Sequence, residues 1–234
     1  MKEQKEFEKF VGIIETLRGE NGCPWDREQT FQSLKPCIME EAAEVTAAIR
    51  IYDTTKNYEN LREELGDLLL QVVMQSQIAK EEGLFSIEDV ISEISEKMIR
   101  RHPHVFGDLN VKTSSEVLIN WEEIKKLEKK EKTWIQSPLT EIPYELPALT
   151  RGTKVLKKIH KIYEPCITGE ESIEKIKENL EKIERFSEDK KEESKIFGDI
   201  LLQICNIARE KEIIPEQVLT DAIENQIDKF EVKR

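Results

Sequence analysis

The sequence predicts an all-α protein, and three observations carry that prediction. Of 234 residues, 38% are hydrophobic and 36% are charged, a balance that suits a helical protein. Only 9 residues are Gly and 8 are Pro, which argues against a β-rich or collagen-like chain. Apolar residues recur at helical spacing almost from the start. A chain of this length can form one large or two small domains with a substantial core.

The charge and the cysteines exclude several classes of function. A net charge of -12 argues against a non-specific nucleic-acid surface, because phosphate backbones are bound through clustered Lys and Arg. No segment approaches the roughly 20 apolar residues of a membrane span, and the N-terminus lacks a signal-peptide core, so we expect a cytoplasmic protein. The cysteines lack zinc-ligand spacing and are interpreted as reduced thiols. They are Cys23, Cys37, Cys166 and Cys205.

The first half of the chain divides into helical segments. Apolar spacing over 7–17 predicts a helix that ends near Gly19. The loop NGCPWD follows, and Asp26 with Gln29 resembles a capping box. In the next apolar run, Pro36 either begins the regular helix or kinks it. Further helices are predicted over 31–49, 61–72, 86–101 and 114–132.

A proline-rich stretch separates this half from a second helical half. Residues 133–147 are the predicted linker, between a first domain at 1–132 and a second domain at 148–234. The motif ELGD at 64–67 is echoed by IFGD at 196–199, which indicates an internal duplication. The repeated glycines, Gly66 and Gly198, are expected to allow close helix packing. Helices of the second half are predicted over 148–163, 171–186, 191–211 and 215–231.

Two pairs of acidic residues border the apolar stripes of successive helices. Positions three apart share a helix face, so Glu41 pairs with Glu44, and Glu64 pairs with Asp67. These pairs are expected to face inward, whereas Glu40 is peripheral. If the two helices pack together, four carboxylates converge and require a cation or basic side chains as compensation. All-oxygen ligation favours Mg²⁺ or Mn²⁺ over zinc, and a solvated acidic face is the alternative.

Basic and aromatic residues follow at the end of the first half. A predicted helix C-terminus carries three basic residues, Lys97, Arg100 and Arg101. They either interact favourably with the helix dipole or bind phosphates. His102 and His104 flank a proline, which favours a capping or packing role over a metal site. Trp121 and Lys125 lie one turn apart and suggest helix docking or contact with a nucleotide.

Four motifs occur in order: GCPWDREQTFQSLKP, EEAAEV, LREELGDLLLQVV and RRHPHVF. Together they closely resemble the MazG family of nucleoside triphosphate pyrophosphohydrolases, in the all-α superfamily that includes dimeric dUTPases and phosphoribosyl-ATP pyrophosphohydrolases. The resemblance covers roughly residues 8–127, and the remainder resembles the second repeat of two-domain members.

The resemblance implies Mg²⁺-dependent hydrolysis of nucleoside triphosphates to the monophosphate and pyrophosphate. The residues implied for metal binding and catalysis are Glu41, Glu44, Glu64 and Asp67. The residues implied for substrate contact are Glu40, Glu63, Lys97, Arg101, Trp121 and Lys125, to which the basic cluster adds Arg100. Either Glu41 or Glu44 is expected to contact the attacking water.

The second repeat departs from this pattern. Aligned on Gly198 and Asp199, it has Ile196 in place of Glu64. The counterpart of EExxE falls in KENLEK, so no hydrolytic site is expected there. Two registers remain open, Glu178 with Glu181 or Asn179 with Lys182.

The sequence therefore predicts a house-cleaning nucleoside triphosphate pyrophosphohydrolase. One alternative is a narrower enzyme that acts on dUTP or phosphoribosyl-ATP, and the other is a non-catalytic helical interaction module. Exposed apolar stripes and the family resemblance predict a homodimer, without nucleic-acid or membrane partners.

Overall fold

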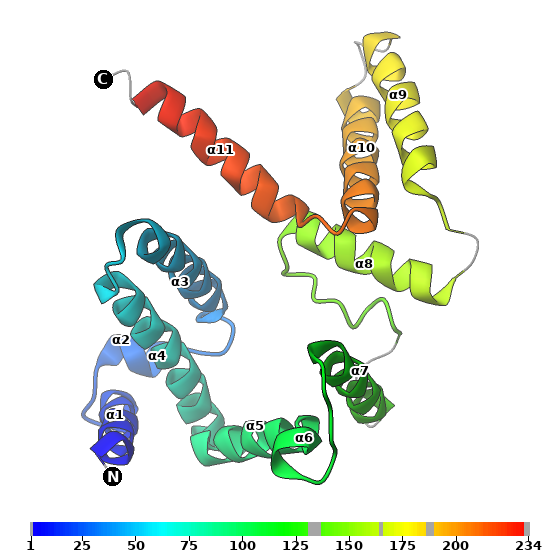
Figure 1. Ribbon diagram of the computed structural model, residues 1–234. Coiled ribbons are helices and arrows are strands. Elements are labelled where there is room, and N and C mark those ends of the chain that lie inside the picture. Colours follow the sequence, from blue (N-terminus) through cyan, green and yellow to red (C-terminus); the bar gives the residue numbers. More distant parts are fainter. Residues whose placement is uncertain (1, 131–136, 164–165, 186–189, 232–234) are drawn as a thin grey trace. The chain divides into compact units, whose positions relative to one another are not determined.

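The computed structural model describes residues 2–130, 137–163, 166–185 and 190–231. Within these ranges the chain forms helices joined by turns and has no strand, which confirms the all-α prediction (Figure 1). The chain divides into two compact units, unit 1 (Met1–Lys125) and unit 2 (Lys126–Arg234). Among the described helices, none has both the length and the apolar character needed to cross a membrane.

Unit 1 is built around a helical hairpin. Its helices are α1 (Lys2–Arg18), α2 (Pro24–Glu28), α3 (Lys35–Thr55), α4 (Glu59–Glu81), α5 (Ile87–Arg101), α6 (Pro103–Phe106) and α7 (Ser114–Lys130), the last of which crosses the unit boundary. Helix α3 packs along α4, and α1 packs on α2 and α4. The buried core consists of Ile14, Leu34, Val73, Met74 and Ile78. The α4 members of this core lie in the second half of the helix, whereas the acidic residues Glu64 and Asp67 lie in its first half.

The NGCPWD loop contains a helical turn that the sequence did not predict. Helix α2 begins at Pro24, where the missing backbone N–H has no cost. Gln29 is the C-cap of this turn, and its side-chain amide donates to the Trp25 carbonyl at 2.9 Å. The predicted capping box of Asp26 and Gln29 is therefore wrong. A capping box does occur at α5, between Ser86 and Asp89.

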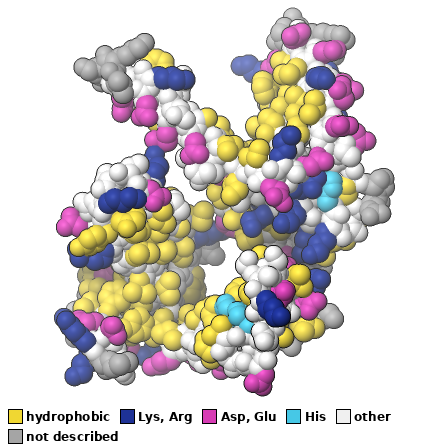
Figure 2. All heavy atoms as spheres, in the orientation of Figure 1, with side chains coloured by type: hydrophobic (Ala, Val, Ile, Leu, Met, Phe, Trp, Pro, Cys, Tyr) yellow, Lys and Arg dark blue, Asp and Glu magenta, His cyan; other side chains and the backbone are white. Residues whose placement is uncertain are grey.

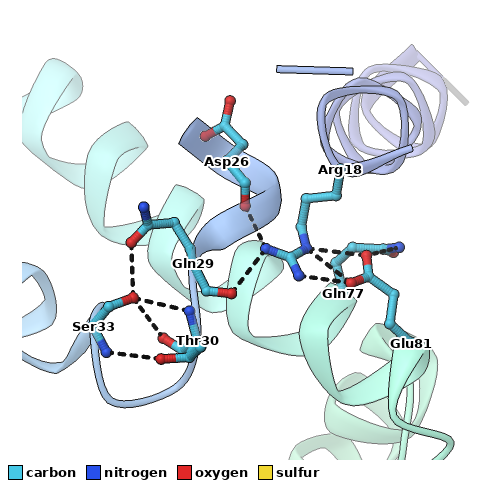
Figure 3. A network of polar contacts seen from close by, with 7 residues as sticks. All are labelled: Arg18, Asp26, Gln29, Thr30, Ser33, Gln77 and Glu81. Atoms are coloured by element: carbon cyan, nitrogen blue, oxygen red, sulfur yellow. Dashed lines mark hydrogen bonds and ion pairs between the residues drawn. The ribbon is translucent and has the colours of Figure 1, made fainter. Parts of the chain in front are cut away.

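Arg18 fixes this region to the rest of unit 1 (Figure 3). Its guanidinium donates to both oxygens of Glu81 on α4, with Nη2 to Oε2 at 2.6 Å. Nη1 of Arg18 also donates to the backbone carbonyls of Asp26 and Gln29. These contacts link α1, α2 and α4 through an Arg18 side chain that is only 6% exposed, although the Glu81 side chain is 37% exposed. Gln77 donates to Glu81 as well and holds its carboxylate in place.

The ends of α3 are set by local backbone chemistry. Pro36 lies in the first turn of α3, so it begins the helix rather than kinking it. The helix ends at Lys56, which adopts a left-handed conformation with φ of 60°. A short turn then leads directly into α4, and this places the acidic residues of both helices on one hairpin.

Unit 2 contains a second helical hairpin. Its helices are α8 (Ala148–Ile162), α9 (Gly169–Arg185), α10 (Lys190–Glu210) and α11 (Pro215–Glu231), in agreement with the predicted ranges to within two residues. Helix α10 packs against both α9 and α8. Buried Asn206 on α10 donates to Ser172 Oγ on α9 at 2.9 Å. The predicted linker at 133–147 is formed by turns over 137–147, and 133–136 lie outside the described residues.

The expectation that the two motif glycines allow close helix packing is wrong. A Cβ added at Gly66 or Gly198 would meet no atom within 4 Å, so neither glycine provides a close helix contact within its unit. The apolar stripe of α4 is only partly buried, since Leu65 and Leu69 are 51% and 40% exposed, in agreement with the exposed apolar stripes expected from the sequence. Hydrophobic side chains gather on the surface over α3 and α4 and again over α10 (Figure 2). All four cysteines are free thiols, as predicted.

Candidate active site

Three acidic side chains converge where α3 packs on α4. Glu41 comes from α3, whereas Glu64 and Asp67 lie one turn apart on α4, and the ligand oxygens of all three lie within 4.8 Å of one another. Glu41 and Glu64 are half-buried. Among the described residues, this is the one group of three or more His, Cys, Asp or Glu side chains that could hold a metal ion.

Asn60 holds one of these carboxylates in position. Its Nδ2 donates to Glu64 Oε1 at 2.7 Å across one turn of α4. Asn60 was not among the residues that the motifs single out. The spacing of four residues between Asn60 and Glu64 was the signal that could have identified it, because such positions are neighbours on a helix.

Glu44 lies beside this cluster rather than within it. Its side chain is exposed, so the expectation that it faces inward is wrong. The pKa of Glu44 is raised, first by loss of hydration and then by the negative charges of Glu64, Glu41 and Glu40. A hydrogen bond with the Glu41 carboxyl acts in the same direction. Glu40 and Glu63 are exposed at the periphery, as expected for Glu40.

The donor set suits a hard divalent cation. Carboxylate oxygens are the ligands that Mg²⁺ and Ca²⁺ prefer, and Mg²⁺ binds through a few carboxylates while it keeps positions for water and phosphate oxygens. Loss of hydration and then the negative charges of Glu64, Glu41 and Glu40 raise the pKa of Glu44, so a bound cation would relieve repulsion at this place. The residues present therefore fit a magnesium-type site.

A second group of predicted site residues meets where the C-terminal end of α5 contacts α7. The Arg101 guanidinium carbon lies 5.2 Å from the centroid of the Trp121 ring. The His102 ring contacts the same indole edge-on, with centroids 4.9 Å apart. His102 Nδ1 lies 2.6 Å from the Met98 carbonyl oxygen, and His102 is also the cap residue between α5 and α6. His102 thus has the packing and capping role that the sequence favoured.

The remaining basic residues are less tightly grouped. Lys97 is half-buried on α5, whereas Arg100 is exposed. Lys125 lies one turn beyond Trp121 on α7, and its Nζ donates to Glu122 Oε1 at 3.0 Å. The described residues therefore form an acidic group on the α3–α4 hairpin and a basic, aromatic group on α5, α6 and α7.

Unit 2 differs at the aligned positions. Asn179 on α9 donates to Asp199 on α10 at 2.6 Å, in the place where Glu41 of α3 approaches Asp67 of α4 in unit 1. This contact selects one of the two possible registers, in which Asn179 and Lys182 correspond to Glu41 and Glu44. The unit lacks the acidic set found in unit 1.

Comparison with known proteins connects this geometry to one family. Residues 29–106, which contain the α3–α4 hairpin with its acidic residues and the helices α5 and α6, match the MazG nucleotide pyrophosphohydrolase domain. The chain is 44% identical over 227 residues to the uncharacterized protein YabN of Bacillus subtilis, covering 94% of this chain and 45% of YabN. It therefore spans less than half the length of that relative.

Two named enzymes match over most of their length. The chain is 41% identical to the nucleoside triphosphate pyrophosphohydrolase/pyrophosphatase MazG of Thermotoga maritima, over 96% of this chain and 84% of that protein. It is 39% identical to the nucleoside triphosphate pyrophosphohydrolase of Escherichia coli K12, over 87% of this chain and 78% of that protein. With an all-α fold and the acidic hairpin inside the matched region, the chain belongs to the MazG family of nucleotide pyrophosphohydrolases.

Proposed function

We propose that the chain hydrolyses nucleoside triphosphates to the nucleoside monophosphate and pyrophosphate, in unit 1, as a house-cleaning enzyme of the nucleotide pool. The observation that carries the proposal is the convergence of Glu41, Glu64 and Asp67 within 4.8 Å on the α3–α4 hairpin. The names of the relatives from Thermotoga maritima and Escherichia coli support the same activity.

The proposed metal ligands are Glu41, Glu64 and Asp67, with Glu44 at the edge of the site, and Mg²⁺ is the proposed ion, with Mn²⁺ as a substitute. When bound, such an ion supplies positive charge to the triphosphate oxygens and to the leaving pyrophosphate. Asn60 holds the Glu64 carboxylate through its 2.7 Å hydrogen bond, so one ligand is oriented before any ion binds.

Glu44 is the proposed proton acceptor for the attacking water. A carboxylate with a raised pKa accepts a proton more readily than an ordinary one, and the pKa of Glu44 is raised first by loss of hydration and then by its acidic neighbours. Its exposure leaves it accessible to water. Glu41 is assigned to metal binding because its oxygen belongs to the converging group.

The proposed substrate-binding region consists of the basic and aromatic residues on α5 and α7. Lys97, Arg100 and Arg101 are suited to phosphate oxygens, since Arg can form bidentate contacts with them. Trp121 contacts both the Arg101 guanidinium and the His102 ring, and these contacts orient the indole that is proposed to bind a nucleobase. Lys125 and the peripheral residues Glu40 and Glu63 complete the proposed contact set.

A pyrophosphate-release assay over a panel of nucleotides tests this function. We expect Mg²⁺-dependent release from several canonical and damaged nucleoside triphosphates, with the monophosphate as the second product, and no release after chelation. Release from dUTP alone or from phosphoribosyl-ATP alone would replace the proposal with the narrower enzyme. A folded chain that releases pyrophosphate from none of them would be a non-catalytic interaction module.

We further propose that the chain forms a homodimer through the exposed apolar face of the α3–α4 hairpin. Leu65, Leu69 and Val72 on α4 are each at least 40% exposed, and Ile49 on α3 is 45% exposed. A cluster of exposed apolar side chains of this kind marks an interaction surface. A second copy is the proposed occupant because Leu65 directly follows Glu64 in the sequence, so a copy bound on this face would lie beside the acidic site.

Light scattering on the full chain tests the dimer. We expect a mass of about twice 27.4 kDa for the wild type and a monomer for Leu69→Glu. Leu84→Glu is the matched control, since Leu84 is 62% exposed but lies beyond the end of α4. A wild-type mass of 27.4 kDa would contradict the proposal.

A further inference from the structure

In unit 2, the counterpart of the acidic cluster is a closed network of side-chain hydrogen bonds. Asn179 Nδ2 on α9 donates to Asp199 Oδ2 on α10 at 2.6 Å. Gln203 Nε2, one turn further along α10, donates to the other oxygen of Asp199, Oδ1, at 3.1 Å. Lys182 Nζ donates to Asn179 Oδ1 at 3.4 Å. Both oxygens of Asp199 therefore have a partner within the unit.

The aligned positions of the two units carry different charges. Unit 1 has four carboxylates, at Glu41, Glu44, Glu64 and Asp67. Unit 2 has an amide, an ammonium, an apolar side chain and one carboxylate, at Asn179, Lys182, Ile196 and Asp199. The first set needs a cation to balance its repulsion, whereas the second is neutral and its hydrogen bonds are satisfied.

We propose that the Asn179 amide and the Lys182 ammonium take the place of the divalent cation in unit 2. This unit then joins α9 to α10 without metal and leaves all metal binding to unit 1, so the inference rests on the metal site of the proposed function. Asn179 and Gln203 are only 7% and 6% exposed, so the amide contacts to Asp199 are largely shielded from solvent, whereas Lys182 is exposed at the edge of the network. Hydrogen bonds to a charged acceptor in such a setting stabilise the helix pair.

The network borders a solvent-accessible pocket of about 490 Å³. The pocket is lined by Asn179, Lys182, Glu192, Lys195, Ile196 and Asp199. Within it, Glu192 is paired with Lys195 at 2.9 Å. A cation could therefore reach carboxylates introduced at Asn179 and Lys182. Mutation at these two positions should therefore be able to restore a metal site in unit 2.

The first test uses a nearly isosteric change in the full chain. The parent for comparison is the Glu41→Gln/Glu64→Gln variant, in which the unit 1 site is silenced. Adding Asn179→Asp puts a second carboxylate against Asp199, so we expect the melting temperature to fall by several degrees without a divalent cation and to recover with Mg²⁺. Glu178→Gln, at an exposed neighbouring position, is the control and should change neither value. An Asn179→Asp variant as stable as its parent would overturn the proposal.

The second test asks whether a metal site can be restored. Mn²⁺ is titrated into the same parent and into the parent with Asn179→Glu/Lys182→Glu, and free Mn²⁺ is followed by electron paramagnetic resonance. We expect no uptake by the parent and at least a tenfold gain in affinity for the variant. Uptake by the parent that Asp199→Asn removes would overturn the proposal, as would a folded variant that takes up no Mn²⁺. Absence of Mn²⁺ uptake by the wild-type chain would instead contradict the unit 1 site.

Discussion

The two helical hairpins of this chain share a sequence pattern and differ in electrostatics. In α3–α4, Glu41, Glu64 and Asp67 bring negative charges within 4.8 Å of one another. In α9–α10, Asp199 is instead held by the amides of Asn179 and Gln203. The glycine and aspartate of the shared motif are kept in both hairpins, although only the first keeps three converging carboxylates that could hold a cation. A repeat can therefore preserve its helix pairing when the acidic residues beside its motif are replaced.

The largest expected effect concerns the acidic residues of α3. Glu41→Gln should lower the rate of pyrophosphate release by more than about 100-fold, the upper end of the loss seen for residues that merely orient metal ligands. Glu44→Gln should lower kcat less and leave Mn²⁺ affinity unchanged, because Glu44 is exposed and lies outside the converging group. Equal losses of Mn²⁺ affinity in both variants would place Glu44 among the ligands.

The hydrogen bond from Asn60 to Glu64 gives the next prediction. Asn60→Ala should weaken metal affinity by about 10- to 100-fold, because an unheld carboxylate must be ordered when the ion binds. Raising the Mg²⁺ concentration should restore kcat. Glu192→Ala at the aligned position of α10 is the control and should leave both parameters unchanged. A loss of kcat that Mg²⁺ does not restore would assign Asn60 a different role.

Replacing each motif glycine with alanine tests whether a second copy covers the surface of α4 but not that of α10. Neither Gly66 nor Gly198 has an atom within 4 Å of an added Cβ, so Gly198→Ala should stabilise the chain by about 1 kcal/mol through helix propensity. Gly66→Ala should do the same in a monomer. If a second copy covers α4 closely, Gly66→Ala will instead weaken dimerisation. Thermal unfolding and light scattering on the two variants separate these outcomes.

The smallest expected effect is on acid stability. Hydrogen bonding to Arg18 lowers the pKa of Glu81 below its ordinary value of 4.5. A lowered pKa means that the native state binds the proton less readily than the unfolded state. The stabilisation is therefore present above pH 4.5 and is lost as the pH falls through the lowered value.

Glu81→Gln should make unit 1 less sensitive to pH in this range. The effect is small because the Glu81 side chain is 37% exposed and solvent screens the pair. Glu171→Gln is the comparison in unit 2, where hydrogen bonds from Thr168 lower the pKa of Glu171. Unfolding curves measured between pH 3 and 7 check both variants. An unchanged acid transition in Glu81→Gln would show that the Arg18 contact does not act through protonation.

The helical class and most helix positions could be predicted because helical periodicity is strong and local. The helices of unit 2 match their predicted ranges to within two residues. The α2 turn was missed because it has only five residues and no periodic pattern. The Asp26–Gln29 capping box was wrong because the spacing alone does not show which helix end a polar residue occupies.

The acidic site was predictable in composition but not in detail. Because positions three apart share a helix face, the sequence predicted that Glu64 and Asp67 lie together, as the structure shows. Whether Glu44 turns inward depends on the rotation of α3 against α4, and this follows from tertiary packing rather than from spacing. For the same reason the sequence left two registers open in unit 2, until the contact between Asn179 and Asp199 distinguished them.

The central claim is that unit 1 performs the chemistry and unit 2 does not. The most direct measurement compares Mg²⁺-dependent pyrophosphate release by Glu64→Gln and by Asp199→Asn in the full chain, with helix content measured by circular dichroism. We predict that Glu64→Gln is inactive while folded, and that Asp199→Asn retains a rate within about twofold of the wild type. Near-wild-type turnover by folded Glu64→Gln, or loss of turnover in folded Asp199→Asn, would contradict the claim.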